Sequence, residues 1–210
     1  PYILQKYEIL KKKSSDSINA MLLKMVENPS LYCRENALKA LYTTGKTEYI
    51  MRALKILDRG SFYHSPKLLT DGLLSFEGDC EESTARIWES YGEFSVSMKV
   101  TLLNYMRFRS GGYEERMLAL LNNEQENEEV HYACIRYLGK YPLEEAYPVL
   151  LDLVKKERER TWQYAAIAAS ALASYPGDET VDALKEKLSS QNWYVRLNAS
   201  KSLEILGLGY

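Results

Sequence analysis

Apolar residues recur along the chain at the spacing of an amphipathic helix. In the segment 49–57 they occupy positions 49, 50, 53, 54, 56 and 57, which places them on one face of a helix. Segments 147–153 and 181–188 show the same i, i+3, i+4, i+7 spacing. No convincing alternation of apolar and polar residues, the pattern of a half-buried strand, appears anywhere. The pattern predicts an all-α protein.

Two distant segments, Tyr32–Leu41 and Tyr194–Leu203, carry one pattern: apolar, Arg, two variable residues, Ala, two variable residues, a small residue and Leu. Its closing apolar residue recurs in steps of 33, 32, 32, 34 and 31, at Leu41, Leu74, Met106, Leu138, Leu172 and Leu203. A second helical series recurs at Leu54, Ile87, Leu120, Leu151 and Leu184. The sequence therefore predicts a two-helix unit of about 32 residues, repeated about five and a half times.

Turn residues such as Ser65-Pro66 and Pro176-Gly177 separate the predicted helices. We expect first helices near 30–43, 65–76, 95–108, 128–140, 161–174 and 193–206, and second helices near 47–58, 80–91, 113–122, 144–156 and 178–189. Two capping helices, near 2–12 and 16–27, are expected within 1–28. One helix pair cannot bury its apolar faces alone, so residues 29–210 should form one continuous right-handed α-solenoid. Because the chain starts at Pro1 and stops shortly after a helix, we expect it to be truncated at both ends.

The pattern resembles HEAT repeats, in the short form of bacterial phycobilisome-lyase-type HEAT proteins. The resemblance covers about residues 29–210 and is carried by Cys33–Leu41 and Val195–Leu203, with Pro148 matching the Pro-containing start of a HEAT second helix. The central repeats depart from it, because Lys or His replaces the Arg. The resemblance implies a scaffold or adaptor whose second helices line a concave groove, and it implies no particular reaction.

One basic residue recurs near the start of most first helices. This basic ladder consists of Arg34, Lys67, Lys99, His131 and Arg196. On a structural interpretation, which we favour, each side chain covers a neighbouring helix and bonds its C-terminal carbonyls. The alternative is an anion-binding stripe.

The charge balance limits the possible partners. The chain has 27 Lys and Arg against 29 Asp and Glu, a net charge of −2, which argues against a dedicated nucleic-acid binder. Residues 1–70 carry +6, residues 71–130 carry −8 and residues 131–210 carry 0, so a partner would meet a dipolar surface. No apolar run reaches the roughly 18 residues of a membrane span. We expect a cytoplasmic protein, with a membrane tether outside this segment left open.

Few residues suggest chemistry. The two histidines, His64 and His131, have no second His or Cys at i+3 or i+4, and the three cysteines form no CxxC pair. Phosphate-binding glycine loops and GxSxG nucleophile motifs are absent from the sequence. We therefore predict no catalytic, cofactor-binding or metal-ligating residue, and a non-enzymatic protein.

A candidate partner site comes from aligning the second helices. Trp88 and Leu121 fall where the other repeats have Lys55, Asp152 and Lys185, which predicts two exposed apolar side chains on adjacent repeats. Arg52, Lys55 and Arg116 would form the charged rim. A one-residue slip in the alignment would bury Trp88 and Leu121 instead, and this alternative stays open.

We expect a protein or peptide ligand held in the concave groove. Two alternatives remain. A HEAT-like DNA glycosylase would bind alkylated DNA on a basic face with aromatic residues, for which Trp88, Trp162 and Trp193 are candidates, but the acidic central section opposes phosphate binding. A helper subunit of a cofactor lyase is suggested only by the family resemblance.

Overall fold

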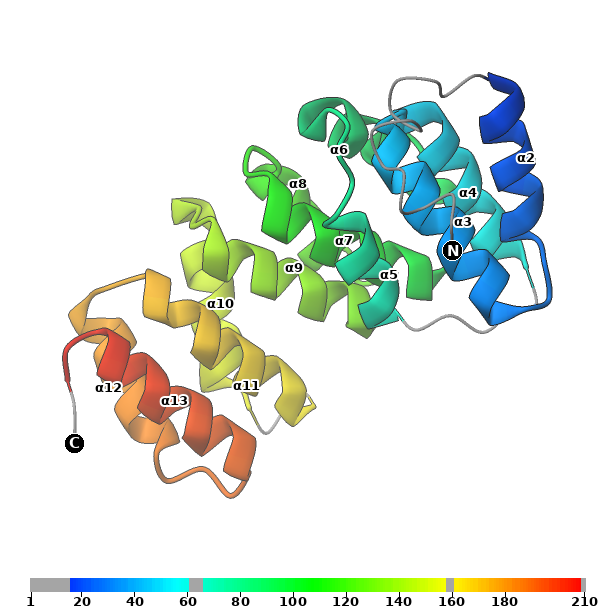
Figure 1. Cartoon of the computed structure of the whole chain (residues 1–210). Helices are drawn as coiled ribbons and strands as arrows, with labels where there is room; N and C mark the ends of the chain where they lie inside the picture. Colours follow the sequence, from blue (N-terminus) through cyan, green and yellow to red (C-terminus); the bar gives the residue numbers. More distant parts are fainter. Residues whose placement is uncertain (1–15, 61–65, 158–160, 209–210) are drawn as a thin grey trace. The chain divides into compact units, whose positions relative to one another are not determined.

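The computed structural model of the protein describes residues 16–60, 66–157 and 161–208. These residues form twelve α-helices and no strand, which confirms the all-α prediction. None of the helices in these ranges combines the length and the apolar character needed to cross a bilayer. The chain divides into two compact units, Pro1–Ser110 and Gly111–Tyr210, which we describe separately (Figure 1).

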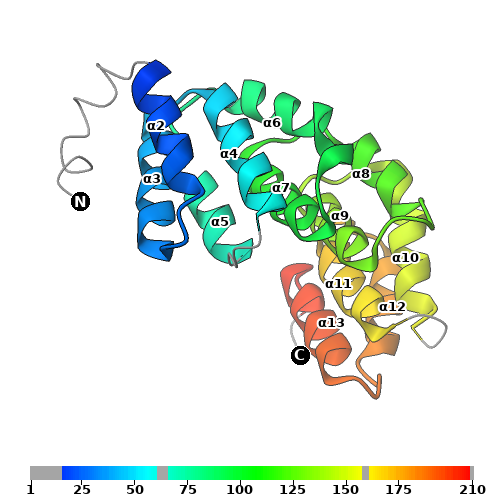
Figure 2. The same ribbon diagram turned by 90° about the vertical axis from the view of Figure 1, so that its right-hand side faces the viewer.

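The first unit contains two layers of helices. Its helices are α2 (Asp16–Val26), α3 (Leu31–Thr44), α4 (Thr47–Arg59), α5 (Pro66–Leu73), α6 (Cys80–Glu89) and α7 (Val96–Arg109), with a 3-10 turn, η2 (Tyr91–Glu93). In one layer α5 packs between α3 and α7, and in the other α4 packs between α2 and α6 (Figure 2). Each helix therefore packs against the helix two places away in the sequence, and the pairs α2–α3, α3–α4 and α6–α7 connect the two layers.

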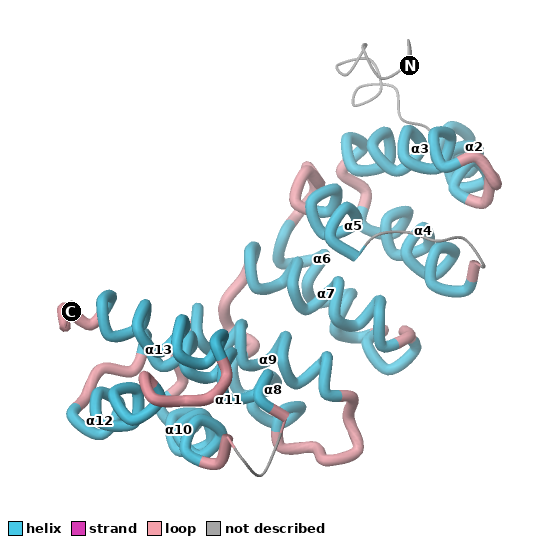
Figure 3. The backbone as a smooth tube through the Cα atoms, turned by 90° about the horizontal axis from the view of Figure 1, so that it is seen from below, coloured by secondary structure: helices cyan, strands magenta, loops and turns pink. Residues whose placement is uncertain are grey.

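The second unit has the same organisation. It contains α8 (Glu114–Leu121), α9 (Glu128–Lys140), α10 (Tyr147–Lys155), α11 (Trp162–Ala171), α12 (Asp178–Lys187) and α13 (Trp193–Ile205), with 3-10 turns η3 (Glu144–Ala146) and η4 (Leu172–Ser174). Helix α11 packs between α9 and α13, while α10 lies beside α12 (Figure 3). The pairs α8–α9, α10–α11 and α12–α13 connect the two layers.

The helix boundaries lie close to the predicted ones. Helix α9 covers 128–140 as predicted, and the predicted helix 144–156 begins as the 3-10 turn η3 before continuing as α10. Asn192 caps α13 by accepting a hydrogen bond from the Tyr194 N–H at 2.9 Å, which satisfies a donor that the helix itself leaves unpaired. The predicted capping helix 2–12 and His64 lie outside the described residues.

Most of the predicted anchors are buried, but two are misplaced by one residue. In the first series Leu74 is only half-buried, and Leu73, at 1% exposure, takes its place as the last residue of α5. In the second series Leu120 is half-buried and Leu121 is the buried residue. A shift of one residue turns a helical side chain by about 100°. An evenly spaced template therefore fails wherever a loop is one residue longer or shorter.

Helices α9 and α11 approach each other closely at a glycine. A Cβ placed on Gly139 would lie 2.9 Å from both Cα and Cβ of Ala171. Two hydrogen bonds fix the same contact: Ser174 donates to the Gly139 carbonyl at 2.6 Å, and Tyr175 donates to the Leu138 carbonyl at 3.0 Å. The missing side chain thus allows the two backbones to meet.

We expect Gly139→Ala to lower the free energy of unfolding by about 1–3 kcal/mol, because overpacking against backbone outweighs the higher helix propensity of alanine. Denaturant titration would measure the change. Gly92→Ala is the control, since a Cβ at Gly92 meets nothing within 4 Å. Equal stability of the two variants would show that the close approach does not limit the packing.

Candidate functional site

The predicted partner site is not assembled as expected. Trp88 lies half-buried on α6 and stacks on Tyr91, with ring centroids 5.2 Å apart. Leu121 is 7% exposed on α8, so the prediction that its side chain is exposed is wrong. The alternative, in which the helix alignment is off by one residue, is correct for Leu121. The two residues also belong to different units. Lys55 is held 2.9 Å from Glu93, within the unit of Trp88.

The two predicted rim arginines are exposed and contact aromatic rings near them in sequence. The Arg52 guanidinium lies 5.6 Å from the ring centroid of Tyr49 on α4. The Arg116 guanidinium lies 5.4 Å from the ring centroid of Tyr113. Such exposed contacts contribute little individually. The structure therefore brings Trp88, Leu121 and the three basic residues into no common site within either unit.

A groove of about 990 Å³ lies in the second unit, between the end of α8, the start of α9, α10 and the start of α11. We call it the acidic groove. It is lined by Leu121, Asn122, Glu124, Glu126, Glu128, His131, Pro148, Val149, Asp152, Leu153, Thr161 and Tyr164. Its volume is at the upper end for ligand pockets.

Apolar side chains form one part of the acidic groove. Leu121 at the end of α8 and Leu153 on α10 are buried. Pro148 and Val149, in the first turn of α10, are exposed and half-buried respectively. The alignment placed Leu121 one position too far round the helix, and its actual, buried position makes it part of this lining.

Four carboxylates form another part. Glu124, Glu126 and Glu128 come from the α8–α9 loop and the first residue of α9, and Asp152 comes from α10. Asp152 is paired with Lys156 at 2.9 Å. Lys and Arg are absent from the twelve lining residues, so the groove presents predominantly negative charge at neutral pH.

His131 and Tyr164 form the wall of the groove, and His131 bonds this wall to its neighbours. Its Nε2 lies 3.1 Å from the Asn123 carbonyl oxygen, and its Nδ1 lies 2.7 Å from the Tyr164 hydroxyl. Because a carbonyl only accepts, Nε2 carries the proton and donates, and in the neutral ring Nδ1 accepts from Tyr164. Beside them the Tyr132 ring packs edge-on against the Tyr164 ring. Burial raises the pKa of the Tyr132 hydroxyl. Both imidazole nitrogens are thus used in holding α9, its preceding loop and α11 together.

The two arginines of the basic ladder make matching contacts. Arg34 is 5% exposed and donates to the carbonyls of Asn28 and Pro29, at 2.9 and 2.8 Å. Arg196 donates to the carbonyls of Ser190 and Gln191, at 2.6 and 3.0 Å. In both cases the acceptors lie six and five residues before the arginine. Each arginine therefore holds the loop that leads into its own helix.

The other ladder members differ. Lys99 places its Nζ 4.8 Å from the ring centroid of Tyr91, which lies in the segment before α7. Lys67 is exposed and pairs with Asp71 one turn later, at 2.6 Å. The prediction for Lys67 fails because the buried anchor of α5 is Leu73, which shifts the ladder position to Pro66.

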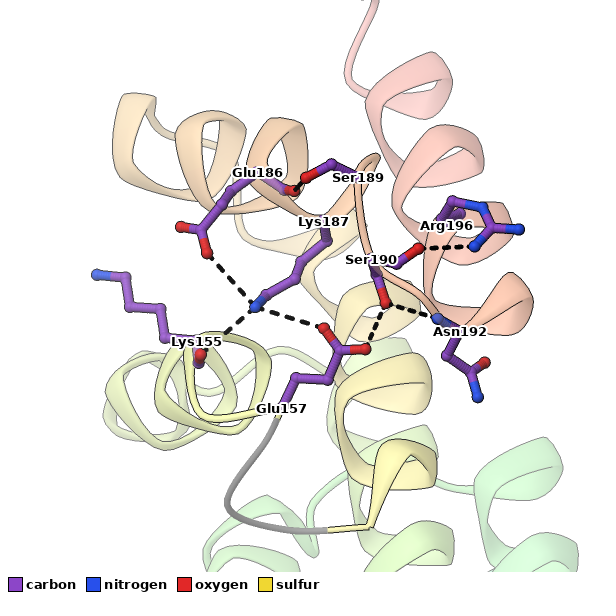
Figure 4. Close-up of polar contacts among 8 residues, drawn as sticks. All are labelled: Lys155, Glu157, Glu186, Lys187, Ser189, Ser190, Asn192 and Arg196. Carbon is purple, nitrogen blue, oxygen red and sulfur yellow. Dashed lines mark hydrogen bonds and ion pairs between the residues drawn. The ribbon is translucent and has the colours of Figure 1, made fainter.

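A second polar network surrounds the loop before α13 (Figure 4). Lys187, 7% exposed at the end of α12, places its Nζ 3.5 Å from Glu157 Oε2 and donates to the Lys155 carbonyl at 3.4 Å. Glu157 also accepts from the Ser190 hydroxyl, which in turn accepts from the Asn192 N–H at 3.1 Å. The network connects the end of α10 to the α12–α13 loop.

Sequence reasoning missed both the acidic groove and Lys187. The glutamates at 124, 126 and 128 form no recognisable motif in the sequence, and only the fold brings Asp152 into the same groove. Lys187 lies 33 residues after the buried Val154. A lysine three residues after the anchor Leu184, where Leu57 and Val154 occupy the equivalent positions, was a signal that could have been found.

No three His, Cys, Asp or Glu side chains of the described chain are grouped as a metal site requires. Burial raises the pKa of the Cys134 thiol on α9, which disfavours the thiolate. No protein-family model matches the chain, and no curated protein matches it. What the protein does is therefore inferred from its own side chains.

Arg34→Ala and Arg196→Ala should each lower the free energy of unfolding by about 0.5–2 kcal/mol, because each leaves two loop carbonyls without their charged donor. Thermal or denaturant unfolding would measure this. Lys67→Ala, at the exposed ladder position, should change stability by less than about 0.5 kcal/mol. Arginine variants with unchanged stability but weakened anion binding would instead support the anion-binding stripe.

Glu157→Gln should lower the free energy of unfolding by about 1–3 kcal/mol, because the buried Lys187 ammonium loses its buried counter-charge. Glu186→Gln is the matched control: its carboxylate is also 3.5 Å from Lys187 but its side chain is 69% exposed. The control should cost less than about 0.5 kcal/mol. Equal losses in the two variants would contradict the role of burial.

Proposed function

We propose that the protein is a HEAT-like α-solenoid that acts as a non-enzymatic scaffold and binds a protein or peptide. The observation that carries this proposal is the acidic groove, which lies between successive second helices, α8 and α10. Second helices are the ones expected to line the binding face of a HEAT solenoid.

The regular spacing of polar contacts supports the repeat architecture. Hydrogen bonds join His131 to Tyr164, Ser202 to Ala169 and Asn198 to Ala166, pairs separated by 33, 33 and 32 residues. These separations equal the sequence period. A stacked array of repeats requires contacts between equivalent positions of successive helix pairs.

The composition of the acidic groove favours a polypeptide over a nucleic acid. A DNA-binding groove needs cations to replace the counterions of the phosphates, whereas the lining contains carboxylates and no Lys or Arg. A mixture of buried leucines and exposed polar residues is typical of surfaces that accept a peptide segment. This disfavours the DNA glycosylase alternative.

Site-specific photo-cross-linking in the native cell tests the proposal. A photoreactive amino acid at Asn122, an exposed groove residue, should capture one or a few discrete proteins that mass spectrometry identifies. The same amino acid at Lys201, an exposed residue of α13 outside the groove, should not capture them. Capture of nucleic acid at Asn122, or no protein specific to that position, would contradict a protein-binding scaffold.

A further inference from the structure

We infer that the acidic groove binds a basic, amphipathic segment of a partner protein, one whose Lys or Arg side chains meet Glu124, Glu126 and Glu128 while its apolar side chains contact the floor. The inference rests on the proposed function and specifies the chemistry of the partner. Three properties of the groove support it.

The first property is charge. Glu124 and Glu128 are exposed and Glu126 is half-buried, and all three lie within five residues of the chain and line the groove. Asp152, on the opposite helix α10, already has Lys156 at 2.9 Å. The three glutamates repel one another, and a cationic segment would relieve that repulsion.

The second property is the spread of the carboxylates. They come from a loop, from the start of α9 and from α10, and within the described part of the chain they form no group able to hold a metal ion. A single small cation could therefore contact only part of the set. Several Lys or Arg side chains, spaced along one polypeptide, could contact carboxylates that come from different elements.

The third property is the apolar floor. Leu121 and Leu153 are buried lining residues, and we call them, with the exposed Pro148 and the half-buried Val149, the apolar floor of the groove. A polyamine or an extended polylysine would leave this surface in contact with water. A segment with apolar residues on one face and basic residues beside them would cover it, as in helix-in-groove recognition.

His131 ties three parts of the groove lining together: the α8–α9 loop, α9 and α11. Its ring is 5% exposed and bonded through both nitrogens, to Asn123 and to Tyr164. These groups need no hydrogen bond from a ligand. A preformed groove requires little ordering on binding, which favours affinity for a short segment.

The test uses a fluorescein-labelled peptide of roughly 16 residues, about four helical turns, made of Leu at i, i+3, i+4, i+7 spacing with Lys elsewhere. Fluorescence anisotropy at about 50 mM salt measures its affinity for the full chain, where screening is weak. Peptides with Gln or Glu in place of Lys are measured in parallel. The Lys peptide should bind at least about tenfold more tightly than the Gln peptide, and the Glu peptide least.

The protein variant E124Q/E126Q/E128Q should weaken binding of the Lys peptide by about tenfold and leave binding of the Gln peptide unchanged. The matched control is E115Q/D182N/E204Q, which removes three exposed carboxylates of the same unit outside the groove. It should change the affinity by less than about twofold. Circular dichroism and thermal unfolding of both variants show that each is folded.

Equal binding by the two triple variants, or equal affinity for the Lys and Gln peptides, would overturn the inference. The proposed function fails separately, when no protein is cross-linked specifically through Asn122. If Asn122 captures proteins that lack a basic segment at the cross-link, the scaffold function stands and the basic partner is wrong.

Discussion

Burial of apolar faces between helices about 33 residues apart is the interaction on which the rest of this structure depends. A helix of eight to fourteen residues, the range found here, is marginal alone in water, and its stability comes from the surface that it buries. In the first unit α5 meets this need between α3 and α7, and in the second unit α11 meets it between α9 and α13. Gly139 shows how close the contact becomes, since even a methyl group there would collide with Ala171. The absence of a side chain at Gly139 therefore allows the short distance between these two neighbouring helices of one layer.

The buried polar residues follow from this constraint. Packing helices this closely also buries parts of the loops that join them, and the loop carbonyls must keep hydrogen-bond partners. Arg34 and Arg196 supply those partners from inside their own helices, at the same sequence separation in two different units. His131 does the same with one nitrogen and reaches the next helix with the other. Lys187 holds a loop together with Glu157, although both lie largely out of water. These side chains are thus better understood as parts of the packing than as an exposed ionic stripe.

The acidic groove lies where the end of α8, the α8–α9 loop, α9, α10 and the start of α11 meet. The loop carries Glu124 and Glu126 beyond the end of the short helix α8, and Pro148 lies in the first turn of α10, where the helix needs no N–H donor. The resulting space has an apolar floor and a negatively charged side, with His131 and Tyr164 fixing the wall between them. Carboxylates that come from a loop and two helices, and that are not grouped as a metal site within the described residues, match a polypeptide with several cationic side chains better than a point charge. The proposed partner chemistry therefore follows from the spacing of the charges as much as from their sign.

The sequence by itself predicted the helices, their boundaries within a few residues and a spacing of about 32 residues between equivalent helices. These depend on local hydrophobic spacing and capping residues, which are read directly along the chain. It also located Arg34, Arg196 and His131 as equivalent positions. The register of α5 and α8 was decided only by the tertiary structure, because one residue more or less in a loop turns the following helix by about 100°. The rotation of α5 leaves Lys67 exposed. The rotation of α8 buries Leu121, which lines the groove together with Leu153. Glu124 and Asp152 are 28 residues apart in the sequence, and their joint presence in one groove follows from the packing of α8 on α9, α9 on α11 and α11 on α10, which no local pattern encodes.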